Sequence, residues 1–197
     1  MPIELTLRPA TPSDRPAIAE LYLAAREAAV PMMPPGIHPP DDVRRWVDSW
    51  DLVRREVWLA ETGEGLLGFA DVQDDWLESL YVDPQHTGEG IGAALLDLVK
   101  SLRPNGFCLW VFQSNTGARR FYRDRGLIEL EHTDGSANEE RSPDLRMAWP
   151  GAAPADFFQS LIDEVDGEAV LLRARRAALS AALSAVSARK PESADRP

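Results

Sequence analysis

Hydrophobic positions in the first 150 residues follow two different spacings along the chain. Residues 3–8 alternate apolar and polar side chains, the pattern of a strand with one buried face. Further along, Val43, Trp46 and Val47 lie three or four residues apart, which predicts a helix with one apolar face. These patterns predict strands at residues 3–8, 56–61, 66–73, 76–82, 107–112, 127–131 and 145–149, and helices at about 14–29, 41–50, 91–102 and 114–125. The predicted fold class is α+β, with a mostly antiparallel central sheet flanked by helices.

Two segments depart from this arrangement. Residues 31–40 contain five prolines, which excludes a helix or a central strand and predicts a long loop between the first two helices. From Gly151 the chain is rich in alanine and has no aromatic residue after Phe158, and its apolar residues again lie three or four apart. We therefore predict a domain over residues 1–150 and a C-terminal helical extension over residues 151–197 with a disordered end.

The charge of the chain limits the kinds of partner. It carries 32 Asp and Glu against 21 Lys and Arg, a formal net charge of −11, which argues against nucleic acid and anionic membranes as partners. A single cysteine, Cys108, excludes an internal disulfide, and the spacing of His38, His86 and His132 does not support a metal site. No apolar run approaches the ~20 residues of a membrane span, and the N-terminus lacks a secretory signal pattern. A cytoplasmic location is therefore expected.

A glycine-rich loop is the most informative feature of the sequence. The predicted strand at 76–82 is followed by Gly88, Gly90 and Gly92, which lead directly into an amphipathic helix. Glycines at alternate positions leave successive backbone N–H groups free of side chains, and the helix N-terminus adds about half a positive charge. Together these features favour a cradle for a pyrophosphate, and the alternative is a glycine-rich turn without a ligand.

Two other phosphate-binding loops fit this stretch less well. A Walker loop requires Gly-Lys-Ser/Thr at the start of the helix, whereas this chain has Gly92-Ala93-Ala94. A dinucleotide-binding fingerprint can be placed on Gly88, Gly90 and Ala93, but the acidic residue expected roughly 20 positions later falls in the apolar stretch 108–110.

Two motifs in the chain resemble those of one enzyme family. The first is Val82-Asp83-Pro84 followed by Thr87-Gly-Glu-Gly-Ile-Gly92, and the second comprises Asn115, Ala118, Arg119, Phe121, Tyr122 and Gly126. Both are similar to motifs of the GCN5-related N-acetyltransferase (GNAT) family, although Thr87 stands where Arg or Gln is commoner. The resemblance covers about residues 3–149. It implies an acetyl-CoA-dependent N-acetyltransferase whose sheet is splayed where acetyl-CoA binds.

The resemblance also assigns residues to acetyl-CoA. The pantetheine arm would insert between the strands at 76–82 and 107–112 and pair with the backbone of Leu80, Tyr81 and Val82. A backbone N–H near Val82 would polarise the thioester carbonyl. The remaining cofactor contacts that the resemblance implies are Thr87, Gly88, Glu89, Gly90, Ile91, Gly92, Ala93, Asn115, Ala118 and Phe121.

Two residues are candidates for proton transfer. Tyr122 resembles the general acid of the family, because a phenol of ordinary pKa about 10 can share a proton with a leaving thiolate; the alternative is a core residue. Glu78 lies on the strand before the glycine loop, where an alternating strand would place it on one face with Trp76, Leu80 and Val82. Glu78 is a candidate base for the amine proton, and the alternative is a solvated edge residue.

The acceptor site is predicted in two loops. By resemblance, the proline loop with His38 and the polar stretch 132–144 with Asn138 and Glu139 would hold the acceptor beside Trp76; an ordinary polar hairpin is the alternative for the second loop. We predict acetyl transfer to the primary amine of a small molecule by direct attack. Acetylation of a protein N-terminus or lysine and a non-catalytic acyl-CoA-binding sensor are the alternatives. The extension is also a candidate interface for a homodimer.

Overall fold

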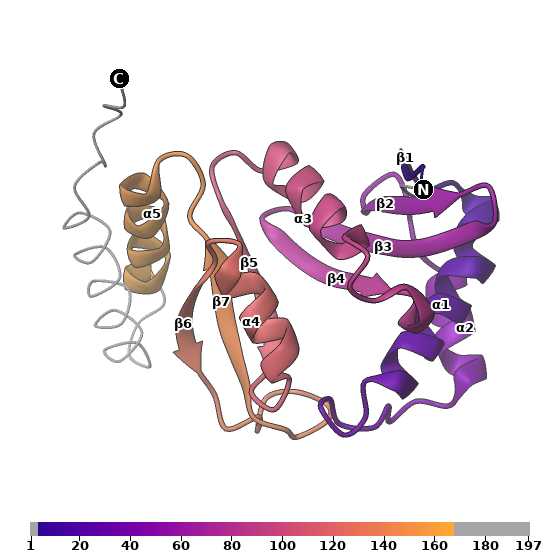
Figure 1. Cartoon of the computed structure of the whole chain (residues 1–197). Helices are drawn as coiled ribbons and strands as arrows, with labels where there is room; N and C mark the ends of the chain where they lie inside the picture. The colour runs from indigo at the N-terminus through magenta and orange to yellow at the C-terminus, as the bar shows by residue number, and fades with distance from the viewer. Residues whose placement is uncertain (1–3, 168–197) are drawn as a thin grey trace.

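Seven strands form one sheet in the computed structural model of the chain, which describes residues 4–167 (Figure 1). Their order across the sheet is β1-β2-β3-β4-β5-β7-β6, and every neighbouring pair is antiparallel except β4 and β5, which run parallel. The predicted α+β fold with a mostly antiparallel sheet is therefore confirmed. The strands are β1 (Thr6–Pro9), β2 (Glu56–Thr62), β3 (Gly65–Gln73), β4 (Trp76–Val82), β5 (Phe107–Phe112), β6 (Ile128–His132) and β7 (Asp144–Trp149).

Helices cover both faces of the sheet (Figure 1). In the described part of the chain they are α1 (Arg15–Ala28), α2 (Pro40–Asp48), α3 (Ile91–Leu102), α4 (Thr116–Asp124) and α5 (Pro154–Gly167), with short 3-10 turns η1 (Pro12–Asp14) and η2 (Pro84–His86). Helices α3 and α4 pack on one face of the sheet. The core on this side includes Leu95 and Leu96 of α3 and Met147 of β7. On the other face α1 and α2 cover the half formed by β2 to β4, and α5 covers the half formed by β5 to β7.

The boundaries of several elements differ by a few residues from the predicted ones. The second helix ends at Asp48, and Trp50 follows in a turn but is still buried in the core beneath α1. The first strand begins at Thr6, and Ile3 lies outside the described residues. Residues 168–197, where the disordered end of the extension is predicted, also lie outside them. Within residues 4–167 no helix is long and apolar enough to cross a membrane.

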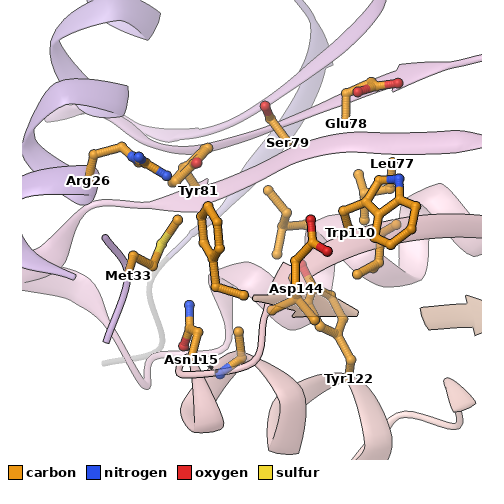
Figure 2. Close-up of a pocket in the computed structure, with 15 residues that line it drawn as sticks. Arg26, Met33, Leu77, Glu78, Ser79, Tyr81, Trp110, Asn115, Tyr122 and Asp144 are labelled. Carbon is orange, nitrogen blue, oxygen red and sulfur yellow. Dashed lines mark hydrogen bonds between the residues drawn. The ribbon is translucent and has the colours of Figure 1, made fainter. Parts of the chain in front are cut away.

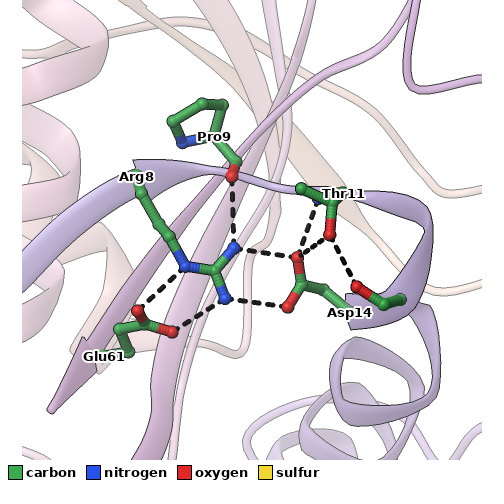
Figure 3. Close-up of polar contacts among 6 residues, drawn as sticks. Arg8, Pro9, Thr11, Asp14 and Glu61 are labelled. Atoms are coloured by element: carbon green, nitrogen blue, oxygen red, sulfur yellow. Dashed lines mark hydrogen bonds and ion pairs between the residues drawn. The ribbon is translucent and has the colours of Figure 1, made fainter. Parts of the chain in front are cut away.

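A polar cluster joins the first strand to its neighbours (Figure 3). The guanidinium of Arg8 donates to both carboxylate oxygens of Asp14 and of Glu61, each at 2.8 Å. Asp14 also accepts from the backbone N–H of Thr11 at 2.8 Å. The hydrogen bonds from Arg8 hold the pKa of Asp14 well below its ordinary value. The cluster thereby ties β1 to β2 and fixes the start of α1.

The sheet opens between β4 and β5. These parallel strands share one paired position, Trp76 with Cys108, where the Cys108 N–H donates to Asp75 O at 2.9 Å. Beyond this point the two strands diverge (Figure 1), which is the splay that the resemblance implies. Backbone groups on the facing edges of both strands are thus left for a ligand inserted between them.

A bulge in β4 changes which side chains share a face. Val72 pairs with Leu77 and Asp71 pairs with Ser79, so Glu78 is an extra residue between two ladder positions. The extra residue reverses the alternation: Leu77, together with Leu80 and Val82, packs in the core under α3, whereas Trp76 packs on the opposite face. The prediction that Trp76, Glu78, Leu80 and Val82 share one face is therefore wrong.

Candidate active site

A cleft of about 210 Å3 occupies the gap between β4 and β5 (Figure 2). It reaches both faces of the sheet: Leu80, Ala118 and Tyr122 lie on the side of α3 and α4, and Trp110 lies on the other side. The other residues that line the cleft are Arg26, Met33, Leu77, Glu78, Ser79, Tyr81, Leu109, Val111, Phe112, Asn115 and Asp144. A molecule in the cleft is therefore accessible from both faces.

A second cavity, of about 580 Å3, lies along the glycine loop and the start of α3. Gly88 and Gly90 have φ of +86° and +89°, and neither has a heavy atom within 4 Å of the position of a Cβ. The space beside their backbone is therefore open, and a side chain at either position would fill it. This geometry, at the N-terminus of a twelve-residue helix, fits the pyrophosphate of acetyl-CoA.

All but one of the residues assigned to acetyl-CoA by resemblance line this cavity. Glu89 does not line it, because its side chain leaves the loop toward solvent. Two side chains that the resemblance does not assign to acetyl-CoA, the imidazole of His86 and the guanidinium of Arg125, also line it. Arg125 lies over the ring of Phe121, 4.1 Å from its centroid. The assigned residues that line the cavity are Leu80, Tyr81, Val82, Thr87, Gly88, Gly90, Ile91, Gly92, Ala93, Asn115, Ala118 and Phe121.

The cavity and the cleft adjoin each other. Both are lined by Leu80, Tyr81, Asn115, Ala118 and Tyr122. An acyl group carried at the end of a long cofactor in the cavity therefore has direct access to the cleft. The direction of a backbone N–H supports the same placement of the acyl group. Asp83 N donates to Leu67 O on β3 at 2.8 Å. Because successive N–H groups of a strand point to opposite edges, the N–H of Val82 points away from β3, to the other edge of β4.

Tyr122 lies at the junction of the cleft and the cavity. Its side chain projects from α4, is 8% exposed and lines both spaces. Burial raises the pKa of its phenol above the ordinary value of 10, so the hydroxyl keeps its proton at neutral pH. The helix is set in place by Asn115, whose Oδ1 accepts from Ala118 N at 3.1 Å. A protonated phenol thus lies at the junction of the two spaces.

Two carboxylates enter the cleft from other elements. Glu78 is the exposed bulge residue of β4, and Asp144 begins β7; Figure 2 shows both on the cleft walls. Asp144 accepts from Nδ2 of Asn138 at 2.9 Å and from the hydroxyl of Thr133. Asp144 is therefore held in position by the loop that precedes it, whereas the side chain of Glu78 is exposed to solvent.

The two predicted acceptor loops lie against each other. His38 Nε2 is 2.9 Å from Glu139 Oε2, and this carboxylate raises the pKa of His38. Arg26, which is 8% exposed, donates to Glu140 Oε1 at 2.9 Å and to Pro34 O at 3.5 Å. The loops between α1 and α2 and between β6 and β7 thus meet beside the cleft.

The remaining predicted acceptor residues are engaged in local contacts. Asn138 donates to Ser142 O at 2.8 Å as well as to Asp144. Trp76 stacks on Trp110, with ring centroids 6.1 Å apart and planes 15° apart, and Trp110 lines the cleft. Trp76 therefore does not line the cleft itself but packs against Trp110, which does. Among the described residues, no group of three or more His, Cys, Asp or Glu side chains is placed to hold a metal ion.

Arg26 is a cleft residue that the sequence analysis missed. A signal was present, because Ile18, Tyr22 and Arg26 are four residues apart and so share one helix face. A charged residue at a position of the buried face indicates a specific partner. The partner, Glu140, lies 114 residues away in sequence, and nothing in the spacing of the chain points to it.

A sheet opened between two parallel strands, with an anion cradle after one of them and a buried tyrosine in the gap, defines an acetyl-CoA-dependent N-acetyltransferase. Residues 54–126 match the family model described as an acetyltransferase (GNAT) domain. The peptidyl-lysine N-acetyltransferase YiaC of Escherichia coli K12 is 30% identical over 153 residues, which cover 73% of this chain and 96% of YiaC. The chain belongs to the GNAT family.

Other relatives agree with this assignment. An uncharacterized N-acetyltransferase of Archaeoglobus fulgidus is 33% identical over 110 residues, covering 48% of this chain and 73% of the relative. The fold matches that of apo YjaB from E. coli, with a TM-score of 0.62 at 19% identity over 76% of this chain and all of YjaB. It also matches PaiA N-acetyltransferase from Thermoplasma acidophilum in complex with coenzyme A, with a TM-score of 0.58 at 20% identity over 75% of this chain and 99% of PaiA.

Proposed function

We propose that this enzyme transfers the acetyl group of acetyl-CoA to the primary amine of a small molecule by direct attack. The cleft carries the proposal, because it joins the cofactor cavity on one face of the sheet to a carboxylate-lined opening on the other. The acetyl group and the amine would thus approach the same point from opposite faces. Such an approach needs no acyl-enzyme.

Different residues of the chain would bind the cofactor, transfer protons and stabilise the developing charge. The cradle from Gly88 to Ala93 would hold the pyrophosphate, and acetyl-CoA supplies the acyl group as a thioester. Glu78 would take a proton from the ammonium form of the acceptor, and the Val82 N–H would stabilise the developing negative charge on the carbonyl oxygen. Tyr122 would give its proton to the departing thiolate, and the second proton that the attacking nitrogen loses would pass through water and restore the phenol.

The size of the acceptor side favours a small amine. The cleft has a volume of about 210 Å3. Beside it, Arg26–Glu140 joins α1 to the loop before β7, and His38–Glu139 joins that loop to the loop after α1. Lining carboxylates and an exposed Trp110 favour a cationic molecule over an acidic one.

A lysine side chain of a protein is the second candidate acceptor. The relative YiaC is described as a peptidyl-lysine N-acetyltransferase, and it matches 73% of this chain. The end of a lysine side chain is itself a primary alkylamine and would enter the same cleft, with the protein backbone held outside the joined loops.

The test is release of coenzyme A from acetyl-CoA with a panel of small primary amines and of lysine-containing peptides. We expect turnover with small amines, and a kcat/KM for the best of them above that for any peptide. Faster turnover of peptides would replace the small-molecule proposal with the lysine one. Binding of acetyl-CoA without turnover on any amine would leave a sensor and overturn the enzymatic proposal.

A further inference from the structure

A third cavity, of about 400 Å3, lies outside the cleft, between α1, α2 and the loop that joins β6 and β7. We refer to it as the α2 pocket. Its wall contains a phenol, an indole, two carboxylates and the imidazole of His38, and no Lys or Arg is among the described residues that line it. The lining residues are Tyr22, His38, Asp42, Val43, Trp46 and Glu139.

The aromatic wall of the α2 pocket is fixed in position. The rings of Tyr22 and Trp46 meet edge to face, with centroids 5.7 Å apart, and Trp46 meets Trp50 in the same way at 5.0 Å. Trp46 is nevertheless 43% exposed. Arg55, which does not line the pocket, places its guanidinium 5.7 Å from the Trp46 ring and 4.5 Å from the Trp50 ring. A partly exposed indole beside carboxylates is a suitable wall for an alkylammonium group.

The carboxylates of the α2 pocket are weakly committed to other partners. Asp42 pairs with Arg45, one turn along α2, whose side chain is 76% exposed. Glu139 pairs with His38, and the two side chains are 74% and 54% exposed. Exposed pairs of this kind contribute little free energy. An ammonium group can therefore join or replace these partners at small cost.

The α2 pocket adjoins the cleft across one pair of rings. Tyr22, in the wall of the pocket, meets Tyr81, in the wall of the cleft, edge to face with centroids 5.0 Å apart. The same relation recurs in the loop between β6 and β7: Glu139 lines the pocket, and its neighbour Glu140 holds Arg26 of the cleft. The two sites therefore lie on opposite sides of one layer of side chains.

We propose that the α2 pocket binds a second ammonium group of the acceptor, remote from the amine that is acetylated. The acceptor class is then a diamine or a longer polyamine, with one nitrogen in the cleft and another against Trp46, Asp42 and Glu139. This inference rests on the proposed acetylation of a small amine. It adds a specificity site that recognises charge at a distance from the reacting atom.

The experiment compares α,ω-diaminoalkanes with n-alkylamines of matched chain length by their kcat/KM. Wild-type enzyme is expected to prefer the diamine at least about tenfold at the best chain length, since a desolvated cation–π contact and a carboxylate act together there. Trp46→Leu and Asp42→Asn are each expected to reduce this ratio about fivefold or more. Asp42→Asn removes an exposed charge on a helix surface, so it tests the site even if Trp46→Leu impairs folding.

Asp48→Asn is the matched control, because Asp48 is exposed on the same helix, carries the same charge and lies outside the α2 pocket. It is expected to leave the diamine-to-monoamine ratio unchanged. A wild-type ratio near one at every chain length would overturn the inference, and so would an equal loss in Asp48→Asn and Asp42→Asn.

A direct binding measurement separates this inference from the proposed function. If neither amine series is acetylated, the proposed function fails; titration of wild-type protein and Trp46→Leu with tetramethylammonium then tests the pocket alone. Saturable binding in wild type that Trp46→Leu abolishes would support a cation site, and equal binding in both proteins would overturn it.

Discussion

Tyr122 and Glu78 reach the cleft from α4 and from β4 and lie on opposite walls of it in Figure 2. Their surroundings differ in exposure to solvent. The phenol is buried and keeps its proton, whereas the carboxylate is exposed and in reach of solvent. At this scale the sequence motif predicted the residue types and not their environments, because burial depends on packing partners far along the chain.

Replacing Tyr122 with phenylalanine tests the proposed proton donor. The ring would keep its packing against Phe121, so binding of acetyl-CoA is expected to stay within about twofold. The value of kcat is expected to fall at least about tenfold, because the leaving thiolate loses its proton source. Calorimetric titration and steady-state kinetics measure the two quantities. An unchanged kcat would remove Tyr122 from the mechanism.

Asp71 provides a residue-scale prediction about stability. It is 1% exposed, its nearest cation is Arg55 at 3.6 Å, and burial raises the pKa of its carboxyl from 3.8 to about 6. The folded state therefore binds a proton that the unfolded state releases, so this group's contribution to stability is complete below pH 4 and is lost as the pH rises through 6. The full loss is about 3 kcal/mol, at 1.36 kcal/mol per pKa unit.

Asp71→Asn should abolish that loss. Urea unfolding at pH 4 and at pH 8 is expected to show a smaller decrease in the free energy of unfolding for the variant than for the wild type. Asp97→Asn, on the exposed side of α3, is the control for a general charge effect. A pH dependence identical in the wild type and in Asp71→Asn would contradict the assignment of a buried, desolvated carboxyl.

Elements with a strong local signal were predicted well. The strand at Trp76–Val82, the three glycines and the helix at Ile91–Leu102 all lie where the sequence placed them. The bulge at Glu78 was missed, since an extra residue is defined by the pairing of β4 with β3 and leaves no mark in the spacing of apolar residues. The residues that pack against Trp76 could therefore be identified only from the structure.

A prediction about one element concerns the glycine loop and its binding of acetyl-CoA. Gly90→Asp combined with Gly92→Asp places two carboxylates beside the cradle, so saturable binding of acetyl-CoA is expected to be lost in calorimetric titration. Gly63→Asp is the control, because Gly63 lies in the β2–β3 turn with nothing within 4 Å of its Cβ position. Retained binding in the double variant would mean that the loop does not hold the pyrophosphate.

The whole molecule is held together by contacts that no local pattern predicts. Arg26 and Glu140, separated by 114 residues, join α1 to the loop before β7. Helix α5 covers the face formed by β5 to β7, whereas the sequence predicted a helical extension there without indicating which surface it covers. Such contacts depend on where the chain returns in space.

The packing of α5 leads to the prediction for the whole molecule. Phe158 is fully buried against Cys108, Leu130 and Ala148. Phe158→Ala is expected to lower the free energy of unfolding by about 3–5 kcal/mol in urea titration. Val53→Ala, at a position that is 94% exposed, should leave it unchanged. Equal unfolding curves for the two variants would mean that α5 does not stabilise the domain.

The two substrates would approach opposite faces of one sheet, and this separation affects how the enzyme can diversify. The cradle for acetyl-CoA consists of backbone on the side of α3 and α4, whereas the acceptor side is made of side chains from α1, α2 and the loop before β7. Substitutions on the acceptor side therefore leave the backbone of the cradle in place. The same separation offers protein engineers a way to exchange acceptors, since new amine specificities can be selected at Trp46 and its neighbours while the donor stays fixed.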